Sequence, residues 1–112
     1  MKIQKKTNET GAEFIALEGD LDFHSSPDVR TELSKLVDRQ TKKILIDLKK
    51  VSYIDSSGLA TFVELFQKMK RYGGILVIFN LSQGVRSVFE IAKLDAIFKL
   101  AKDEKDALAL IA

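Results

Sequence analysis

Two short segments made up almost entirely of apolar residues constrain the fold more than any other feature of the chain. They run from Lys43 to Leu48 and from Ile75 to Asn80. Strands that are apolar on both faces are usually covered on both faces, as in the interior of a parallel or mixed sheet. The sequence between them should therefore supply helices that cover the sheet.

Three further segments with β-like sequence complete the predicted sheet. They span Lys2 to Lys6, Glu13 to Gly19 and Ile97 to Leu100. Residues Asn8 to Gly11 have the polar and glycine-containing composition of a turn, so they are expected to join the first two strands.

Four amphipathic segments predict the helices. The first begins at Ser25-Ser26-Pro27-Asp28, which offers a hydroxyl cap, proline at the first helical position and an acid in the first turn. The second runs from about Ser57 to Tyr72 and should end because Gly73-Gly74 supplies positive φ. A third helix follows Ser82, and a short fourth helix begins near Asp103.

The expected architecture is a single α/β domain over residues 1–112, with a mixed, mostly parallel sheet flanked by about four helices in the order β-β-α-β-α-β-α-β-α. Functional sites in such sheets gather where strands end and helices begin. The helical residues expected to face the core are Val29, Leu33, Leu36, Val37, Leu59, Phe62, Val63, Phe66, Met69, Val85, Val88, Phe89, Ala92, Ala107, Leu108 and Ile111.

The composition excludes several kinds of chemistry. The chain has no cysteine, so it lacks disulfides and thiolate metal sites, and we expect it to be cytoplasmic. Its one histidine, His24, is too few for most zinc hydrolases. The 18 Lys and Arg and 16 Asp and Glu are spread along the chain, which indicates no nucleic-acid partner. We also expect no cofactor and no bound metal. We expect no membrane insertion either, because no apolar run approaches the ~20 residues that span a bilayer.

The segment Asp55-Ser56-Ser57-Gly58 stands at the start of the second predicted helix, and it has two interpretations. The first is an ordinary N-cap, because Asp and Ser are common caps. The second is that one serine presents an exposed hydroxyl that can carry a phosphate, which free N–H groups at the helix start would hold without a change of fold. Both interpretations can hold for adjacent residues.

A serine hydrolase is a weak alternative. Either serine of this segment would be the nucleophile and His24 the base, but the nucleophile elbow needs Gly two residues before the serine. Ile54 and Asp55 occupy those positions. The carboxylates of Asp20 and Asp22 could similarly act as an acid–base pair or as metal ligands, but Gly-Asp-Leu-Asp before a helix is more typical of a turn.

Three segments resemble the STAS domain. They are Gly19-Asp20-Leu21-Asp22, Ile44 to Leu48, and Val51 to Leu59. The chain is most similar to the bacterial anti-sigma factor antagonists of that family, and the resemblance covers essentially its whole length. The Asp-Ser-Ser-Gly-Leu segment is the most specific part of it.

This resemblance implies a regulator without catalysis of its own. In the family, the unmodified antagonist binds an anti-sigma factor that is also a serine kinase, which frees the sigma factor. Phosphorylation ends the binding, and a PPM-type phosphatase restores it. The modified hydroxyl maps onto Ser56, with Ser57 at the neighbouring position, and the implied partner-binding residues are Asp22, Asp55, Ser56, Ser57 and Gly58. We expect a monomer when no partner is bound.

One position departs from the family pattern. Antagonists often carry glycine two residues after the glycine of the motif, where this chain has Ala60. The segment is also similar to STAS proteins that serve lipid-transporting ABC systems as accessory subunits. Other relatives are scaffolds of signalling complexes, and some STAS domains bind nucleotides. The alternative functions are therefore a transporter accessory subunit or a signalling scaffold.

Overall fold

The computed structural model describes all 112 residues, which form five strands and four helices in the predicted order. The strands are β1 (Lys2–Thr7), β2 (Glu13–Glu18), β3 (Lys43–Lys50), β4 (Ile75–Phe79) and β5 (Lys99–Ala101). The helices are α1 (Ser26–Asp38), α2 (Ser56–Arg71), α3 (Gln83–Ile91) and α4 (Glu104–Ile111). None of the helices combines the length and the apolar character needed to cross a membrane.

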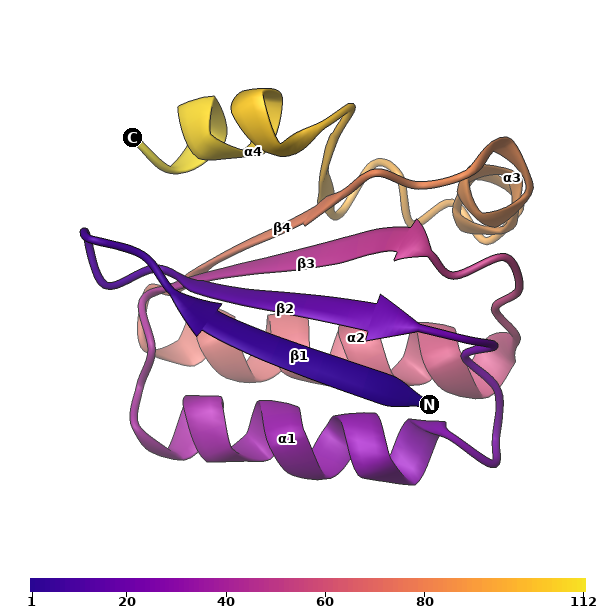
Figure 1. Cartoon of the computed structure of the whole chain (residues 1–112), viewed down its shortest axis with the longest axis horizontal. Coiled ribbons are helices and arrows are strands. Elements are labelled where there is room, and N and C mark those ends of the chain that lie inside the picture. Colours follow the sequence, from indigo (N-terminus) through magenta and orange to yellow (C-terminus); the bar gives the residue numbers. More distant parts are fainter.

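The five strands form one mixed sheet in the order β1-β2-β3-β4-β5 (Figure 1). Strand β1 is antiparallel to β2, and all other neighbouring strands are parallel. Helices α1 and α2 cover one face, while α4 packs over β4 and β5 on the opposite face (Figure 1). Strands β3 and β4 therefore have neighbours on both edges and cover on both faces, which explains their apolar sequences.

Two hydrophobic cores lie on opposite faces of the sheet. The larger core, between the sheet and α1, α2 and α3, includes Ile46, Phe62 and Phe89. The smaller core lies under α4 and includes Leu45 and Phe79. Because successive side chains of a strand point to opposite faces, Leu45 and Ile46 belong to different cores.

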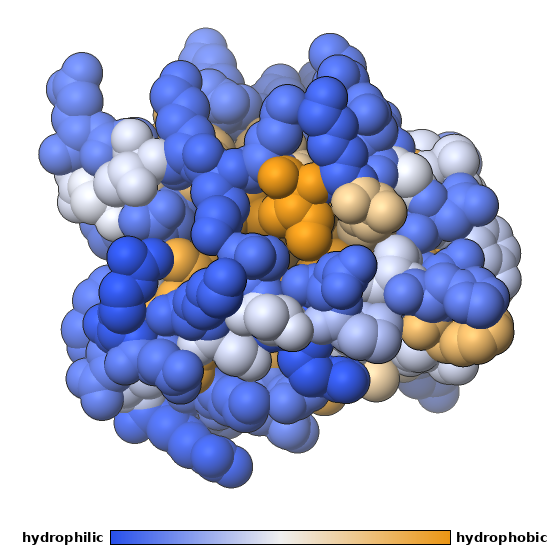
Figure 2. Space-filling model, turned by 60° about the horizontal axis from the view of Figure 1, so that its bottom comes forward, coloured by the Kyte–Doolittle hydropathy of each residue, from blue (hydrophilic) through white to orange (hydrophobic).

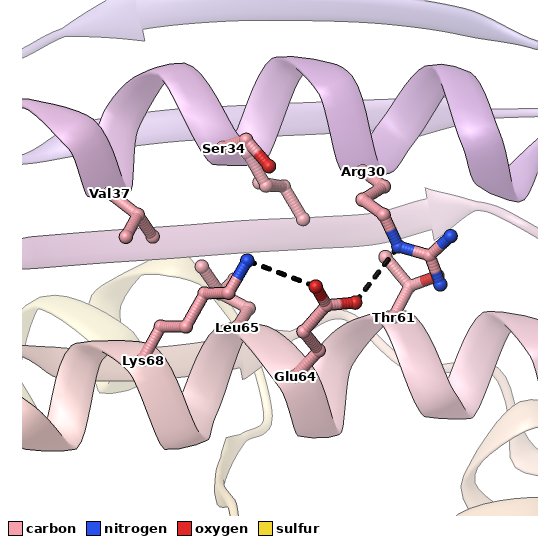
Figure 3. A pocket seen from close by; sticks show the side chains of 8 residues that line it. Arg30, Ser34, Val37, Thr61, Glu64, Leu65 and Lys68 are labelled. Carbon is pink, nitrogen blue, oxygen red and sulfur yellow. Dashed lines mark hydrogen bonds and ion pairs between the residues drawn. The ribbon is translucent and has the colours of Figure 1, made fainter.

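One ion pair joins α1 and α2 on the outer side of the molecule, and a second lies within α2. Glu64 of α2 contacts both Arg30 of α1, at 2.8 Å, and Lys68, at 3.0 Å (Figure 3). The space left between these side chains is only about 10 Å³, which is room for about one water. Figure 2 shows this side of the molecule, where hydrophilic side chains surround a small apolar area. The helix pair thus offers no cavity for a ligand.

The two glycines after α2 act in different ways. Gly73 has φ +78°, as predicted for a residue that ends a helix. Gly74 does not have positive φ, so that part of the prediction was wrong. A Cβ at Gly74 would lie 2.9 Å from the Cε of Met69, so this glycine permits close packing on α2 instead.

The last strand begins later than the sequence pattern predicts. The backbone N–H groups of Ile97 and Phe98 donate to the carbonyl of Leu94, at 3.0 and 2.9 Å, so these residues belong to a turn. Strand β5 consequently spans Lys99–Ala101 instead of residues 97–100. Phe98 is nevertheless buried, because its ring packs against Phe89.

Candidate functional site

The candidate site forms where two loops meet at the carboxyl ends of β2 and β3 (Figure 1). The N–H of Leu21 donates to the carbonyl of Tyr53 at 2.9 Å, and the N–H of Asp55 donates to the carbonyl of Leu21 at 3.1 Å. These bonds make an isolated parallel bridge between Leu21 and Ile54. The loop of residues 19–25 is thereby fixed against the start of α2.

Asp55 caps α2 through a single carboxylate oxygen. Its Oδ1 accepts hydrogen bonds from the N–H groups of Ser57 and Gly58, at 2.9 and 3.1 Å, and from the Ser57 hydroxyl, at 2.6 Å. The pKa of Asp55 is lowered, chiefly by the Ser57 hydroxyl and further by the amides of Gly58, Ser57 and Phe23, against the opposing effect of desolvation. The capping interpretation is confirmed for this residue, whose carboxylate is ionised at neutral pH.

The two serines that follow are not equivalent. Ser57 is half-buried, and its hydroxyl donates to Asp55. Ser56, the first residue of α2, is exposed, and its hydroxyl has no hydrogen-bond partner within the chain. A reagent or a partner protein therefore meets the hydroxyl of Ser56 without breaking an interaction of the fold.

The amides at the start of α2 are less available than the sequence suggested. We expected free N–H groups to hold a phosphate at this helix end, but those of Ser57 and Gly58 already donate to Asp55. A phosphate on Ser56 would have to share these donors with a carboxylate of the same sign. The expectation was wrong for these two amides, because the cap occupies them first.

Gly58 brings the start of α2 into contact with the neighbouring loop. It is buried, and a Cβ placed on it would lie 2.8 Å from the Cγ of Leu21 and 2.9 Å from the Leu21 carbonyl oxygen. It would also lie 2.8 Å from the Cγ1 of Ile54. Real Cβ atoms do not approach other atoms so closely, so only glycine fits here.

The loop before α1 is held by its own side chains. The Oδ1 of Asp22 accepts hydrogen bonds from the N–H groups of His24 and Ser25, at 3.0 and 3.1 Å. The Ser25 hydroxyl donates to the carbonyl of Asp20 at 2.7 Å and makes no capping bond to α1. The predicted hydroxyl cap was therefore wrong, because Ser25 points back into the loop and closes it.

Comparison with known proteins establishes the family of this chain. The family model described as "STAS domain" matches residues 3–107. The chain belongs to the STAS family.

Individual relatives of this STAS protein extend over nearly its whole length. It is 36% identical over 105 residues to the anti-sigma-B factor antagonist of Bacillus subtilis, covering 93% of this chain and 94% of that one. Its fold is similar to that of an anti-sigma factor antagonist from Mycobacterium paratuberculosis, with a TM-score of 0.89, 20% identity and coverage of 97% and 92%. The Bacillus cell fate determinant SpoIIAA in its phosphorylated form gives a TM-score of 0.76 at 22% identity, with coverage of 99% and 100%.

Two exposed aromatic residues flank the site of this STAS domain and were not singled out from the sequence. Phe23 is 66% exposed and Tyr53 is 53% exposed. Their only signal in the sequence is that they are aromatic residues in polar loops, outside the apolar periodicity of any element. They are the exposed large apolar side chains of the two loops that meet at the bridge.

His24 does not join the serines in a catalytic arrangement. Its ring packs on that of Phe23, with centroids 4.0 Å apart, and it makes no hydrogen bond to Ser56 or Ser57. No three Asp, Glu or His side chains gather anywhere in the STAS domain as a metal site would require. Of the two serines of the motif, only Ser56 keeps a hydroxyl that is free of hydrogen bonds within the chain.

Asp55→Ala is expected to lower the thermal unfolding midpoint of the STAS domain at pH 7, because three hydrogen bonds to the carboxylate are lost. The folded pKa lies below the ordinary value of 3.8, so the stabilising contribution is present above that value and disappears as the pH falls through the folded pKa. The difference in midpoint between wild type and variant should therefore shrink at acid pH. Thermal unfolding followed by circular dichroism from pH 7 to about pH 2.5 measures it.

The matched control is Asp20→Ala, since the Asp20 side chain is exposed and forms no ion pair in the chain. Its midpoint should track that of the wild type at every pH. A deficit of Asp55→Ala that stays constant across this range would show that the ionised carboxylate is not what stabilises the start of α2.

Proposed function

We propose that this STAS protein is an anti-sigma factor antagonist that is switched by phosphorylation of Ser56. The unmodified protein binds an anti-sigma factor serine kinase in the cytoplasm and thereby frees the sigma factor. Phosphorylation ends this binding, and a PPM-type phosphatase restores it. The protein acts by binding alone and is not an enzyme.

The observation that carries the proposal is the free hydroxyl of Ser56. It is exposed at the first residue of α2, while the adjacent Asp55 and Ser57 are bonded to each other. The name of the Bacillus subtilis relative, an anti-sigma-B factor antagonist, supports the same function. The existence of SpoIIAA in a phosphorylated form supports modification as the means of control.

The structure offers a physical reason why a phosphate on Ser56 would act strongly. It adds about −1.5 to −2 charges at neutral pH, beside the ionised carboxylate of Asp55. The amides of Ser57 and Gly58 already donate to that carboxylate, so they do not neutralise the added charge. A partner surface fitted to a neutral hydroxyl would then have to bury an unneutralised dianion, which carries a desolvation penalty. Each 1.4 kcal/mol of lost binding free energy weakens the complex about tenfold.

Phosphosite mapping tests the modification directly. The purified protein is incubated with ATP and each serine kinase of its source organism, and intact mass and peptide fragmentation are measured. We expect one phosphate on Ser56, none on Ser56→Ala, and an unchanged site in Ser57→Ala. Modification of Ser57 in the wild type would contradict the assignment, because that hydroxyl is the one bonded to Asp55.

Binding measurements test the switch. Ser56→Ala is expected to bind the kinase as the wild type does but to stay bound when ATP is added, because it has no hydroxyl to modify. Ser56→Asp should bind at least tenfold more weakly, because it places a negative charge where the phosphate would lie. Equal affinities for both variants would contradict the switch. Stable association with membrane ATPase subunits, and no phosphate, would favour the transporter accessory instead.

A further inference from the structure

We propose that Phe23 is an aromatic anchor through which the serine kinase docks on the surface around Ser56. The partner would receive the ring in an apolar pocket whose rim carries Lys and Arg side chains. This inference rests on the proposed function and adds the residue and the surface chemistry by which the partner recognises the site. Three features of the structure carry it: exposure, fixed position and charge.

Phe23 is a large apolar side chain held in place on the surface. It is 66% exposed, although burying an aromatic side chain is strongly favourable. Asp22 binds the backbone of His24 and Ser25, so the loop on either side of Phe23 is closed by hydrogen bonds. The ring packs on the His24 imidazole, at 4.0 Å between centroids. A side chain already fixed in this way loses little conformational entropy when a partner covers it.

Phe23 lies in a loop that contacts the start of α2, where Ser56 is located. The N–H of Asp55 donates to the carbonyl of Leu21 at 3.1 Å, so the loop that carries Phe23 and the start of α2 are in direct contact. Ser56 belongs to the first turn of a capped helix and is therefore presented by a folded surface. A protein that closes over this hydroxyl also meets the neighbouring loop and its exposed ring. Aromatic residues at the centre of an interface often carry much of its binding energy.

The negative charge around Phe23 indicates that the edge of the partner's binding surface is positively charged. Residues 19–29 and 51–63 contain four carboxylates, Asp20, Asp22, Asp28 and Asp55, and no Lys or Arg. The rest of the chain then has 18 basic residues and 12 acidic ones, since 16 minus 4 is 12, which is a net charge of +6. Asp20 and Asp28 form no ion pair within the chain. The basic residues that border these two segments, Arg30 and Lys50, are paired with Glu64 and Glu18. The two loops are therefore acidic on a chain whose remainder is basic, which suits a partner with a cationic rim.

The rim charges and the contact at Ser56 should affect different rate constants. Charges at the edge of an interface mainly change the association rate and its salt dependence. A group at the closely packed centre mainly changes the dissociation rate. A cationic rim is therefore compatible with release by a phosphate at Ser56.

The test is surface plasmon resonance with the purified kinase that binds the wild type. Phe23→Ala should weaken binding at least tenfold through faster dissociation, while Phe23→Tyr stays within a few-fold of the wild type. The control is Leu110→Ala on α4, which removes another exposed apolar side chain, 45% exposed, on the other face of the sheet, and should bind normally. Asp20→Asn should slow association several-fold at low salt and little at high salt.

The outcomes separate this inference from the proposed function. If Ser56→Asp loses binding but Phe23→Ala binds as the wild type does, the anchor is wrong and the switch stands. If no serine kinase of the source organism binds the wild type, both fail. Sedimentation at increasing concentration tests whether a second copy of this chain binds the surface instead of the kinase. Self-association that Phe23→Ala abolishes would assign the surface to that second copy and overturn the inference.

Discussion

Gly58→Ala is expected to lower the free energy of unfolding by about 1–3 kcal/mol, the range for inserting a methyl group into a packed site. The added Cβ would lie 2.8 Å from side-chain atoms of Leu21 and Ile54 and 2.9 Å from the backbone oxygen of Leu21. Because one of these atoms belongs to the backbone, the loop or the helix must move apart. Urea denaturation of the wild type and the variant measures the difference.

A second glycine provides the control for this experiment. Gly84 lies in α3, and a Cβ built there meets nothing within 4 Å. Alanine is favoured over glycine within a helix by roughly 0.5–1 kcal/mol, so Gly84→Ala should be neutral or stabilising. Equal effects of the two substitutions would show that the contact between Gly58 and Leu21 does not hold the site together.

Phe62→Ala should have the largest effect on stability, a loss of about 3–5 kcal/mol, as for other buried phenylalanines. Phe62 is fully buried at the centre of the larger core, and its ring stacks on that of Phe89 with centroids 6.3 Å apart. Removing the ring leaves a cavity between α2, α3 and the sheet that rigid neighbours fill only in part. Chemical denaturation gives this number directly.

Phe23→Ala is the matched comparison, because it removes the same ring from a position that is 66% exposed. Its free energy of unfolding should stay within about 0.5 kcal/mol of the wild type, as for other surface substitutions. A large loss of stability in this variant would mean that its ring supports the fold, and its effect on binding would then need correction for unfolding.

The fold was predictable because its main signals are local. The apolar segments of β3 and β4, the Pro27 start of α1 and the Gly73 end of α2 each act within a few residues of the chain. The order of elements and the mixed sheet follow from these signals. The late start of β5 did not, because the carbonyl of Leu94 continues the turn after α3 and no local pattern marks that bond.

The core face of α2 was predicted less accurately than its ends. Leu65 was not expected in the core but is only 3% exposed, while Val63 and Phe66, which were, are half-buried. Helix α2 packs against α1 as well as against the sheet, so its buried surface is wider than a single stripe. The periodicity of one segment does not show where a neighbouring helix will pack, because that position depends on the whole fold.

One residue of α3 was also predicted incorrectly. Ala92, predicted to face the core, ends α3 and is exposed.

The sequence predicted the cap of α2 but not the hydrogen bonds that close the loops around it. The sequence indicated a cap and a free hydroxyl within one motif, and the structure confirms the cap at Asp55 and shows which hydroxyl is free. The Leu21–Ile54 bridge and the bond from Ser25 to Asp20 were not foreseen. They depend on the loops being closed by the fold, and the exposure of Phe23 follows from the same closure.

Four consecutive residues at the start of α2 differ sharply in how much the fold depends on them. Asp55, Ser57 and Gly58 are each required by a hydrogen bond or by close packing, whereas the side chain of Ser56 contributes to neither. Substitutions at Ser56 should therefore be neutral for folding and matter only to whatever binds there. Under the phosphorylation switch proposed for Ser56, a single mutation would separate a regulated protein from a permanently active one, and evolution could move between them without passing through an unstable intermediate.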